Sequence, residues 1–178
     1  QSRFMERQEQ MRADLVDEEP GAETAAIGKS RSARSTRPST IGSESTESSL
    51  EPLGLLKISK LRLEVPILKG TDELTLNRGL GWIDGTSLPG GEGNSGIAGH
   101  RDSFFRHLED IQVGDAIEVL TPKANHVYTV DGMRVVSPSE IDVLRPREKS
   151  SLTLVTCYPF YFIGPAPSRY IVEASLKQ

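Results

Sequence analysis

In the larger, C-terminal part of the chain, hydrophobic and polar residues alternate in short runs. In LRLEVPI, every second residue from Leu61 to Ile67 is apolar, which places those side chains on one face of a strand. Pro66 lacks an N–H group, so this strand is expected at a sheet edge or to end there. Five other runs have strand character: NSGIAGH, AIEVLT, HVYTVDGMRVV, SLTLVTC and SRYIVEA. The turn signals that accompany them are LPGGEGN, VGD, PKAN and DG.

Only two short stretches in this part have a helical pattern, TDELTLNRG and DSFFRHLED. Asp102 opens the second stretch and is expected to cap its N-terminus, because a carboxylate can accept from the free N–H groups of the first turn. Many short strands with so little helix predict a mainly β fold, either a small closed barrel or a sandwich.

The N-terminal part has a different composition, and the change falls near Leu53. Residues 1–20 carry Phe4, Met11 and Leu15 at helical spacing, which predicts a marginal amphipathic helix. Residues 21–49 are rich in small polar and charged groups and cannot bury enough apolar surface to offset their ordering entropy. We therefore expect an N-terminal segment over 1–52, with a flexible tether, and a folded domain over 53–178.

Charge and composition exclude some functions. The 178-residue chain has a net charge of -4 and a pI near 5.5. A nucleic-acid-binding domain needs a basic face to neutralise phosphates, so we expect no nucleic-acid partner. No run approaches the roughly 20 apolar residues that span a bilayer. Since the chain begins with Gln1, we expect that a membrane anchor precedes it in the full-length protein.

Cys157 is the only cysteine, so it forms no internal disulfide and belongs to no zinc-binding cluster. One interpretation is a small apolar residue at the end of a core strand. The other is a nucleophile, which needs a base or cation nearby and donors for an oxyanion. His100 closes NSGIAGH and Arg169 opens SRYIVEA, and both stand at strand ends, where a barrel can bring distant residues together. Composition alone leaves the two interpretations balanced.

The segment Thr153–Cys157 resembles the signature of the sortase family, a TLxTC strand end. In that family an arginine lies on the next strand and a histidine closes an earlier one, as Arg169 and His100 do, in the same order. The resemblance runs from about residue 53 to residue 174. The stretches AGHRD and CYPFYFIGPAPSRYIV are most similar to class D sortases.

The resemblance implies a cysteine transpeptidase on a closed eight-stranded β-barrel with short helices. Such enzymes cleave an LPxTG-like C-terminal sorting signal and transfer the protein to a primary amine through a thioester. It further implies that Cys157 is the nucleophile, that His100 moves protons and that Arg169 orients the substrate and stabilises the oxyanion. The implied location is the extracytoplasmic face of a bacterial membrane, with an N-terminal anchor.

Other polar and aromatic residues are expected to have lesser roles. Asp102 could orient the imidazole of His100, but helix capping explains it as well, so it is not in the catalytic set. His107 and His126 are expected to be surface or structural residues. The aromatic residues are expected mostly in core or loop packing, with a peptide groove as the alternative: Trp82, Tyr158, Phe160, Tyr161 and Phe162.

Some sortases bind calcium in the loop before the histidine strand. Here that loop, IDGTSLPGGEGN, offers only the carboxylates of Asp84 and Glu92, whereas calcium takes about six to eight oxygen ligands. We expect no metal and no cofactor.

Two other classes of function remain open. L,D-transpeptidases also combine cysteine, histidine and arginine, but their SxGCxR-type stretch is missing from TLVTCYP. A non-catalytic, membrane-tethered β-barrel that binds a partner would also fit the strands and the tether, and it predicts an unreactive Cys157.

Overall fold

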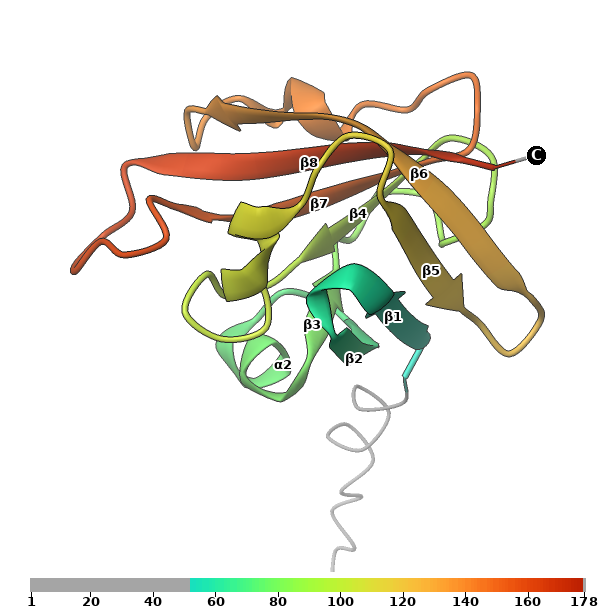
Figure 1. Cartoon of the computed structure of the whole chain (residues 1–178), viewed down its shortest axis with the longest axis horizontal. Coiled ribbons are helices and arrows are strands. Elements are labelled where there is room, and N and C mark those ends of the chain that lie inside the picture. The colour runs from blue at the N-terminus through green and yellow to red at the C-terminus, as the bar shows by residue number, and fades with distance from the viewer. Residues whose placement is uncertain (1–51, 178) are drawn as a thin grey trace, which may run out of the picture. The chain divides into compact units, whose positions relative to one another are not determined.

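The computed structural model describes residues 52–177, in which eight strands close into a barrel (Figure 1). The expected N-terminal helix and tether lie outside the described residues. Around the barrel the strands follow the order β1-β2-β3-β4-β7-β8-β6-β5. The predicted closed, mainly β barrel is confirmed.

The strands are β1 (Gly54–Ile58), β2 (Leu63–Lys69), β3 (Leu80–Trp82), β4 (Asn94–Ala98), β5 (Ala116–Leu120), β6 (Asn125–Val136), β7 (Ser151–Tyr158) and β8 (Ser168–Leu176). The helical segments are short: η1 (Ser59–Leu61), α2 (Glu73–Arg78), η2 (Arg106–Asp110) and η3 (Ile141–Leu144), where η marks a 3-10 helix. Within residues 52–177, none of these helices has the length and apolar character that crossing a membrane requires.

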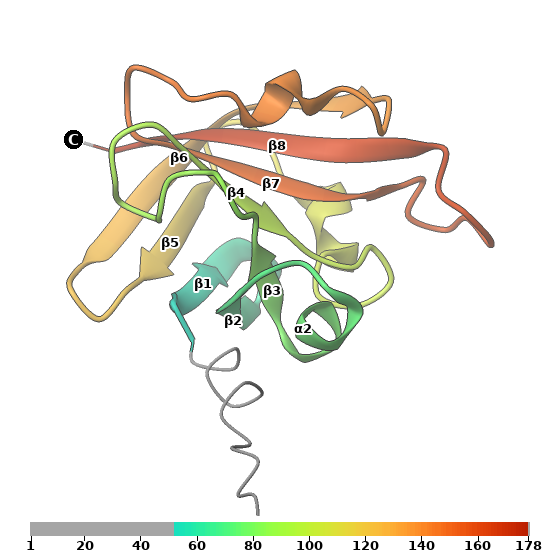
Figure 2. The ribbon, with the colours of Figure 1, turned by 180° about the vertical axis from the view of Figure 1, so that it is seen from behind.

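Two strand pairs in the barrel are parallel, β2 with β3 and β4 with β7, and the other pairs are antiparallel. The barrel closes where β1 pairs with β5. Seen from behind, β4 lies beside β7, and β7 lies beside β8 (Figure 2). Cys157 lies in β7 and Arg169 in β8, and His100 follows the end of β4.

Alternation along the strands separates two hydrophobic clusters. Leu152 and Leu154 of β7 and Ile97 of β4 point into the main core inside the barrel. Val155 lies on the opposite face of β7 and packs against a smaller cluster on the outside. That outer cluster consists of Val136, Val143 and Ile171, with Leu144 and Val155 packed against it.

The prediction for the first strand was partly wrong. Leu63, Val65 and Ile67 are buried in the core as expected, but Leu61 belongs to η1 and packs only partly against it. β2 is not an edge strand, since it pairs with β1 and β3. Pro66 lies inside β2 opposite Leu55 of β1, and the pairing of β2 with β3 begins at the next residue, Ile67.

The dipeptide DG does not form a turn. Asp131 and Gly132 lie inside the single long strand β6, where the register with β8 shifts between Val130 and Gly132. The extra residue forms a β-bulge, and Asp131 accepts a hydrogen bond from Ser175 Oγ. Pairing with a strand that is distant in sequence thus keeps this dipeptide in a strand, although its residues favour a turn.

The two helical predictions had different outcomes. TDELTLNRG forms α2, and Asp72 caps it by accepting from Thr75 N at 3.1 Å. DSFFRHLED forms turns followed by η2, whose N-cap position is Phe105, so the prediction of Asp102 as N-cap was wrong. Phe105 is fully buried in the core, and its N–H donates to His100 O, which folds this segment back onto the end of β4.

Candidate active site

His100 reaches the level of Cys157 because β4 and β7 run parallel in register. The last paired residues are Ala98 and Val155. Two hydrogen bonds extend the alignment beyond the strand, from Gly99 N to Val155 O at 3.1 Å and from Thr156 Oγ1 to Gly99 O at 2.7 Å. His100 follows Gly99, and Cys157 follows Thr156. The two residues therefore lie side by side at the same end of the barrel.

Arg169 lies next to Cys157 on the other side. β7 and β8 are antiparallel, and Cys157 is the register partner of Arg169. Residues directly opposite one another in an antiparallel pair have Cβ atoms about 4.5–5.5 Å apart and share a face. Three consecutive strands of the barrel therefore bring together the three residues predicted from the sequence.

The shared face is the outer face of the sheet. Cys157 alternates in phase with Val155, and Arg169 in phase with Ile171, and both of these apolar residues belong to the outer cluster. All three candidate residues are half-buried, so solvent and a substrate can reach them. Cys157 is a free thiol. Cys157 and Arg169 therefore lie on the outer wall of the barrel.

The guanidinium of Arg169 is held by its own strand entry. Nη1 donates to Ser168 O at 3.0 Å and to Ala166 O at 3.4 Å. Within residues 52–177, no hydrogen bond joins the side chains of Cys157, His100 and Arg169. A guanidinium has five N–H donors, so donors remain for a carbonyl oxygen placed beside Cys157.

Gly99 is needed immediately before His100. A Cβ at this position would lie 2.7 Å from Phe105 Cδ2 and 2.8 Å from Leu80 Cδ2, which is closer than carbon atoms pack. The missing side chain lets the buried ring of Phe105 cover the backbone from the barrel side. His100 is thereby supported by a packed core residue at the point where the chain leaves β4.

A buried polar network, which the sequence analysis did not find, fixes the other end of the same strands. Asn94 Oδ1 accepts from Thr153 Oγ1 at 2.8 Å, and Asn94 Nδ2 donates to Val143 O at 3.0 Å. The network ties β4 to β7 and to the segment that carries the outer cluster. An asparagine at the first position of a predicted strand is the sequence signal that could have indicated it.

The aromatic residues divide between core and loop. Tyr158 and Phe160 pack with Tyr170, with ring centroids 5.2 to 6.1 Å apart, against the main core. Trp82 packs partly against the same core and donates from Nε1 to Ser87 O. Tyr161 and Phe162 are exposed on the loop between β7 and β8.

Tyr170 is the titratable group of this cluster with a shifted pKa. Burial raises the pKa of the phenol, and the neighbouring Tyr158 raises it further. Tyr170 is the register partner of Thr156, directly beside Cys157. The group therefore stays neutral through the neutral pH range and contributes packing beneath the site, not charge.

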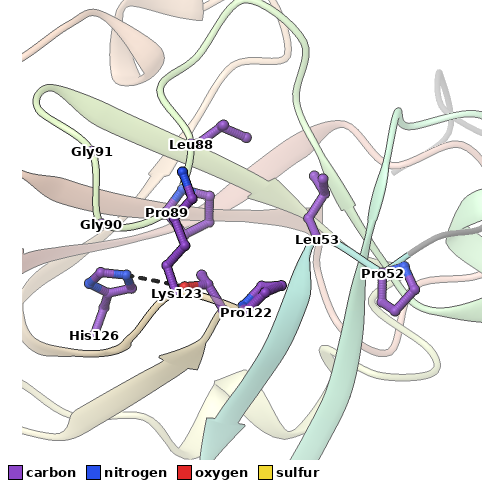
Figure 3. Close-up of a pocket in the computed structure, with 10 residues that line it drawn as sticks. Pro52, Leu53, Leu88, Pro89, Gly90, Gly91, Pro122, Lys123 and His126 are labelled. Carbon is purple, nitrogen blue, oxygen red and sulfur yellow. Dashed lines mark hydrogen bonds between the residues drawn. The ribbon is translucent and has the colours of Figure 1, made fainter.

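The remaining histidines are not part of this site. His107 is exposed in η2. His126 is the second residue of β6, next to the turn between β5 and β6. It lines a pocket of about 530 Å³ with Pro89, Gly90 and Lys123 (Figure 3). Its Nε2 lies 3.4 Å from Thr121 Oγ1. The strand registers place this pocket at the opposite end of the barrel from Cys157, since Asn125 pairs with Leu120 and the start of β6 is near the end of β8.

Comparison with known proteins agrees with this arrangement. A family model described as "Sortase domain" matches residues 56–177. The chain belongs to the sortase family.

Individual relatives and solved structures show which classes of sortase the chain is similar to. The chain is 34% identical to Sortase D of Bacillus subtilis (strain 168) over 120 residues, 67% of this chain and 61% of that protein. A solved Sortase D5 transpeptidase of Clostridium perfringens is 32% identical, with a TM-score of 0.66, covering 72% of this chain and 80% of that one. Sortase A from Corynebacterium diphtheriae is 32% identical, with a TM-score of 0.68, covering 72% and 61%. The resemblance to class D is confirmed, and these comparisons give no support to an L,D-transpeptidase or a non-catalytic barrel.

The matched part of the chain spans about 61% of the length of the Bacillus subtilis relative. The family model establishes the sortase family for residues 56–177.

Proposed function

We propose that the protein is a cysteine transpeptidase that exchanges one peptide bond for another on protein substrates with an LPxTG-like C-terminal sorting signal. The observation that carries the proposal is the register of three neighbouring strands. Cys157 pairs with Arg169 across β7 and β8, and the parallel alignment of β4 with β7 brings in His100. A nucleophile, a proton carrier and a permanent cation on one accessible face suit acyl transfer.

In the first step, the Cys157 thiolate attacks the carbonyl carbon of the threonine in the sorting signal. The C–N bond to the next residue then breaks, and the departing amine takes a proton from His100. The acyl group remains on Sγ as a thioester. No electron transfer is involved, and no external energy is needed because the thioester keeps the acyl group activated.

In the second step, a primary amine attacks the thioester. His100, now neutral, accepts a proton from the incoming amine, and Sγ leaves as a thiolate. The product is a new amide bond and the enzyme returns to its starting state. Water can replace the amine in a slower, hydrolytic side reaction.

Arg169 has two tasks in this proposal. Its fixed position beside Cys157 lets the guanidinium donate to the oxyanion of each tetrahedral intermediate. Its remaining donors can also orient the substrate backbone, since Nη1 alone is engaged with Ser168 O and Ala166 O among the described contacts. The Arg169 charge is permanent, so the oxyanion donor works at any physiological pH.

The proposal includes a cellular setting. We infer that the enzyme acts at the extracytoplasmic face of a bacterial membrane, where both its substrates and an N-terminal anchor would be held. The motivation is the family to which residues 56–177 belong.

The test is incubation of the protein with a peptide library of LPxTG-like variants and a primary amine, followed by mass spectrometry. We expect an acyl-enzyme mass on Cys157 and amide products that contain the added amine. The matched control is Cys157→Ala, which should form neither product while its circular dichroism spectrum stays that of the wild type. Substantial transfer by this variant would refute the proposed nucleophile.

A further inference from the structure

The loop between β7 and β8, residues 159–167, connects the strand of Cys157 to the strand of Arg169. It projects beyond the barrel (Figure 1). Within residues 52–177, the backbone hydrogen bonds that hold turns and loops include none from this loop. Ile163 at its tip is 98% exposed. A segment without a backbone ladder depends on side-chain contacts for its conformation.

Phe160 anchors the beginning of the loop in the main core. Beyond Phe160, Arg101 supplies the polar contacts that hold the loop backbone. Its Nη1 donates to Pro159 O at 3.1 Å and its Nη2 to Gly164 O at 2.9 Å. Its guanidinium also lies 5.8 Å from the ring centroid of Phe162, within the range of a cation–π contact. One side chain therefore bridges the beginning and the middle of the loop.

Arg101 stands next to one of the candidate site residues. Arg101 directly follows His100, and Pro159 follows Cys157 by two residues. The side chain thus ties the segment of the proton carrier to the segment of the nucleophile. On the far side of the loop, Arg169 donates to Ala166 O and Ser168 O, so arginines hold the loop at both of its ends.

We propose that Arg101 is a positioning residue for the transpeptidation: its guanidinium fixes the 159–167 loop, which keeps Cys157 and Arg169 in place relative to His100. The proposal rests on the proposed function of the same site. Arg101 acts through the loop carbonyls and does not itself take part in bond making. The fork of two nitrogens, each reaching a different carbonyl, is what a lysine cannot reproduce, since its ammonium is a single point charge.

A second contact to the loop provides a comparison. Arg106 lies 5.0 Å from the ring centroid of Tyr161, and Tyr161 Oη donates to Glu109. These groups hold only side chains near the tip. Loss of Arg106 should therefore loosen the tip without releasing the loop carbonyls that Arg101 binds.

The experiment compares Arg101→Gln and Arg101→Lys with Arg106→Gln. Lys123→Gln is the matched control, because it removes the same charge at the turn between β5 and β6, at the opposite end of the barrel. Three quantities are measured: the rate of chymotryptic cleavage after Tyr161 and Phe162, the rate of Cys157 alkylation by iodoacetamide as a function of pH, and kcat and KM for peptide transfer to an amine. Thermal unfolding monitors the fold.

We expect Arg101→Gln to raise the rate of loop cleavage and to change the pH profile of Cys157 alkylation. Its kcat should fall by about 10- to 100-fold, since displacement of a reacting group by about 1 Å can cost about 10²-fold, while KM changes less. Arg101→Lys should recover only part of kcat. Arg106→Gln should raise loop cleavage only slightly, and Lys123→Gln should match the wild type in all three measurements.

Wild-type rates of loop cleavage in Arg101→Gln would overturn the proposal, even if kcat falls, because Arg101 would then act without holding the loop. Full recovery of kcat by Arg101→Lys would also contradict it. If Arg101→Gln does not fold, Arg101→Lys carries the same comparison. Loop cleavage and alkylation need no peptide substrate, so failure of the wild type to transfer any peptide would refute the proposed function while these two measurements still decide the role of Arg101.

Discussion

At the scale of single residues, the proposed site takes one side chain from each of three strands or strand ends. Cys157 and Arg169 are direct register partners, and their relative position is fixed by the backbone ladder. His100 lies just beyond the last ladder pair of β4 and is held by the packing of Gly99 against Phe105. We therefore expect that the nucleophile and the cation are rigidly paired and that His100 depends more on its local support.

The first prediction concerns Arg169. Arg169→Ala should lower kcat by about 10²- to 10³-fold, the typical cost of removing one oxyanion donor. Arg169→Lys should recover only part of this loss, because an ammonium cannot reproduce the guanidinium fork. The measurement is steady-state transfer of a cleavable peptide to an amine. Near-normal rates in Arg169→Ala would assign this residue to packing.

The second prediction concerns His100. His100→Ala should lower kcat by about 10²- to 10⁴-fold through loss of proton transfer. Alkylation of Cys157 by iodoacetamide, which needs no proton transfer to a leaving amine, should be less affected than kcat. Equal losses in both measurements would mean that His100 acts mainly on the thiol and not on the amine.

At the scale of elements, the sequence predicted six of the eight strands and missed the two shortest or least regular, β1 and β3. The sequence predicted both β7 and β8, and it placed Cys157 and Arg169 on them. β3 has only three residues, too few for a period to be recognised, and β1 has adjacent leucines that interrupt the alternation. The bulge in β6 and the turns before η2 depend on partners far along the chain, which local signals do not report.

The same limit applies to the site. The three candidate residues stand in recognisable motifs, whereas Arg101 binds carbonyls that lie 58 and 63 residues further along the chain. Asn94 likewise bonds to Thr153, 59 residues away. Such contacts exist only after the barrel has formed, so no local pattern predicts them.

The third prediction concerns the support beneath His100. Gly99→Ala should destabilise the barrel by about 1–3 kcal/mol through overpacking against Phe105 and Leu80. It should also lower peptide transfer, because relief of the clash moves the backbone next to His100. Urea unfolding and steady-state kinetics measure the two effects. Gly132→Ala is the matched control, since a Cβ there meets no atom within 4 Å, and it should be milder in both measurements.

The fourth prediction concerns the aromatic cluster and alkaline pH. Burial raises the pKa of Tyr170 in the folded protein above its value in the unfolded chain, which is about 10. The protonated phenol is thus favoured by folding. The stability linked to this group is fully present below pH 10 and is lost as pH rises through the raised pKa.

Tyr170→Phe has no such proton to lose. The free energy of unfolding of the wild type should therefore fall more steeply above pH 10 than that of Tyr170→Phe. Urea unfolding at several pH values between 8 and 11 measures the two slopes. Some alkaline loss should persist in the variant, because burial also raises the pKa of Tyr128. Identical slopes for the two proteins would contradict the raised pKa of the partly buried Tyr170.

At the scale of the whole molecule, the barrel of residues 52–177 contains all the residues assigned to the site. The family model likewise begins at residue 56. We propose that residues 1–52 serve as a spacer between a membrane anchor and the barrel. A flexible spacer would keep the enzyme near membrane-held substrates and raise their effective concentration without new contacts.

The fifth prediction follows from the spacer. Deletion of residues 1–50 should leave the kinetics of peptide transfer in solution almost unchanged, because no membrane is present to make the spacer useful. The rival hypothesis is that the stripe of Phe4, Met11 and Leu15 covers the site. A clear rise in activity on deletion would favour that autoinhibitory segment and refute the spacer.

The parallel pairing of β4 with β7 has a consequence for the order of folding events. The hydrogen bond from Thr156 to Gly99 closes a chain segment of 57 residues, and such long-range contacts form slowly because the entropy of loop closure opposes them. Until this contact forms, His100 is not held beside Cys157. The proposed acyl transfer therefore requires the completed barrel, in which His100 and Cys157 lie at the ends of neighbouring strands.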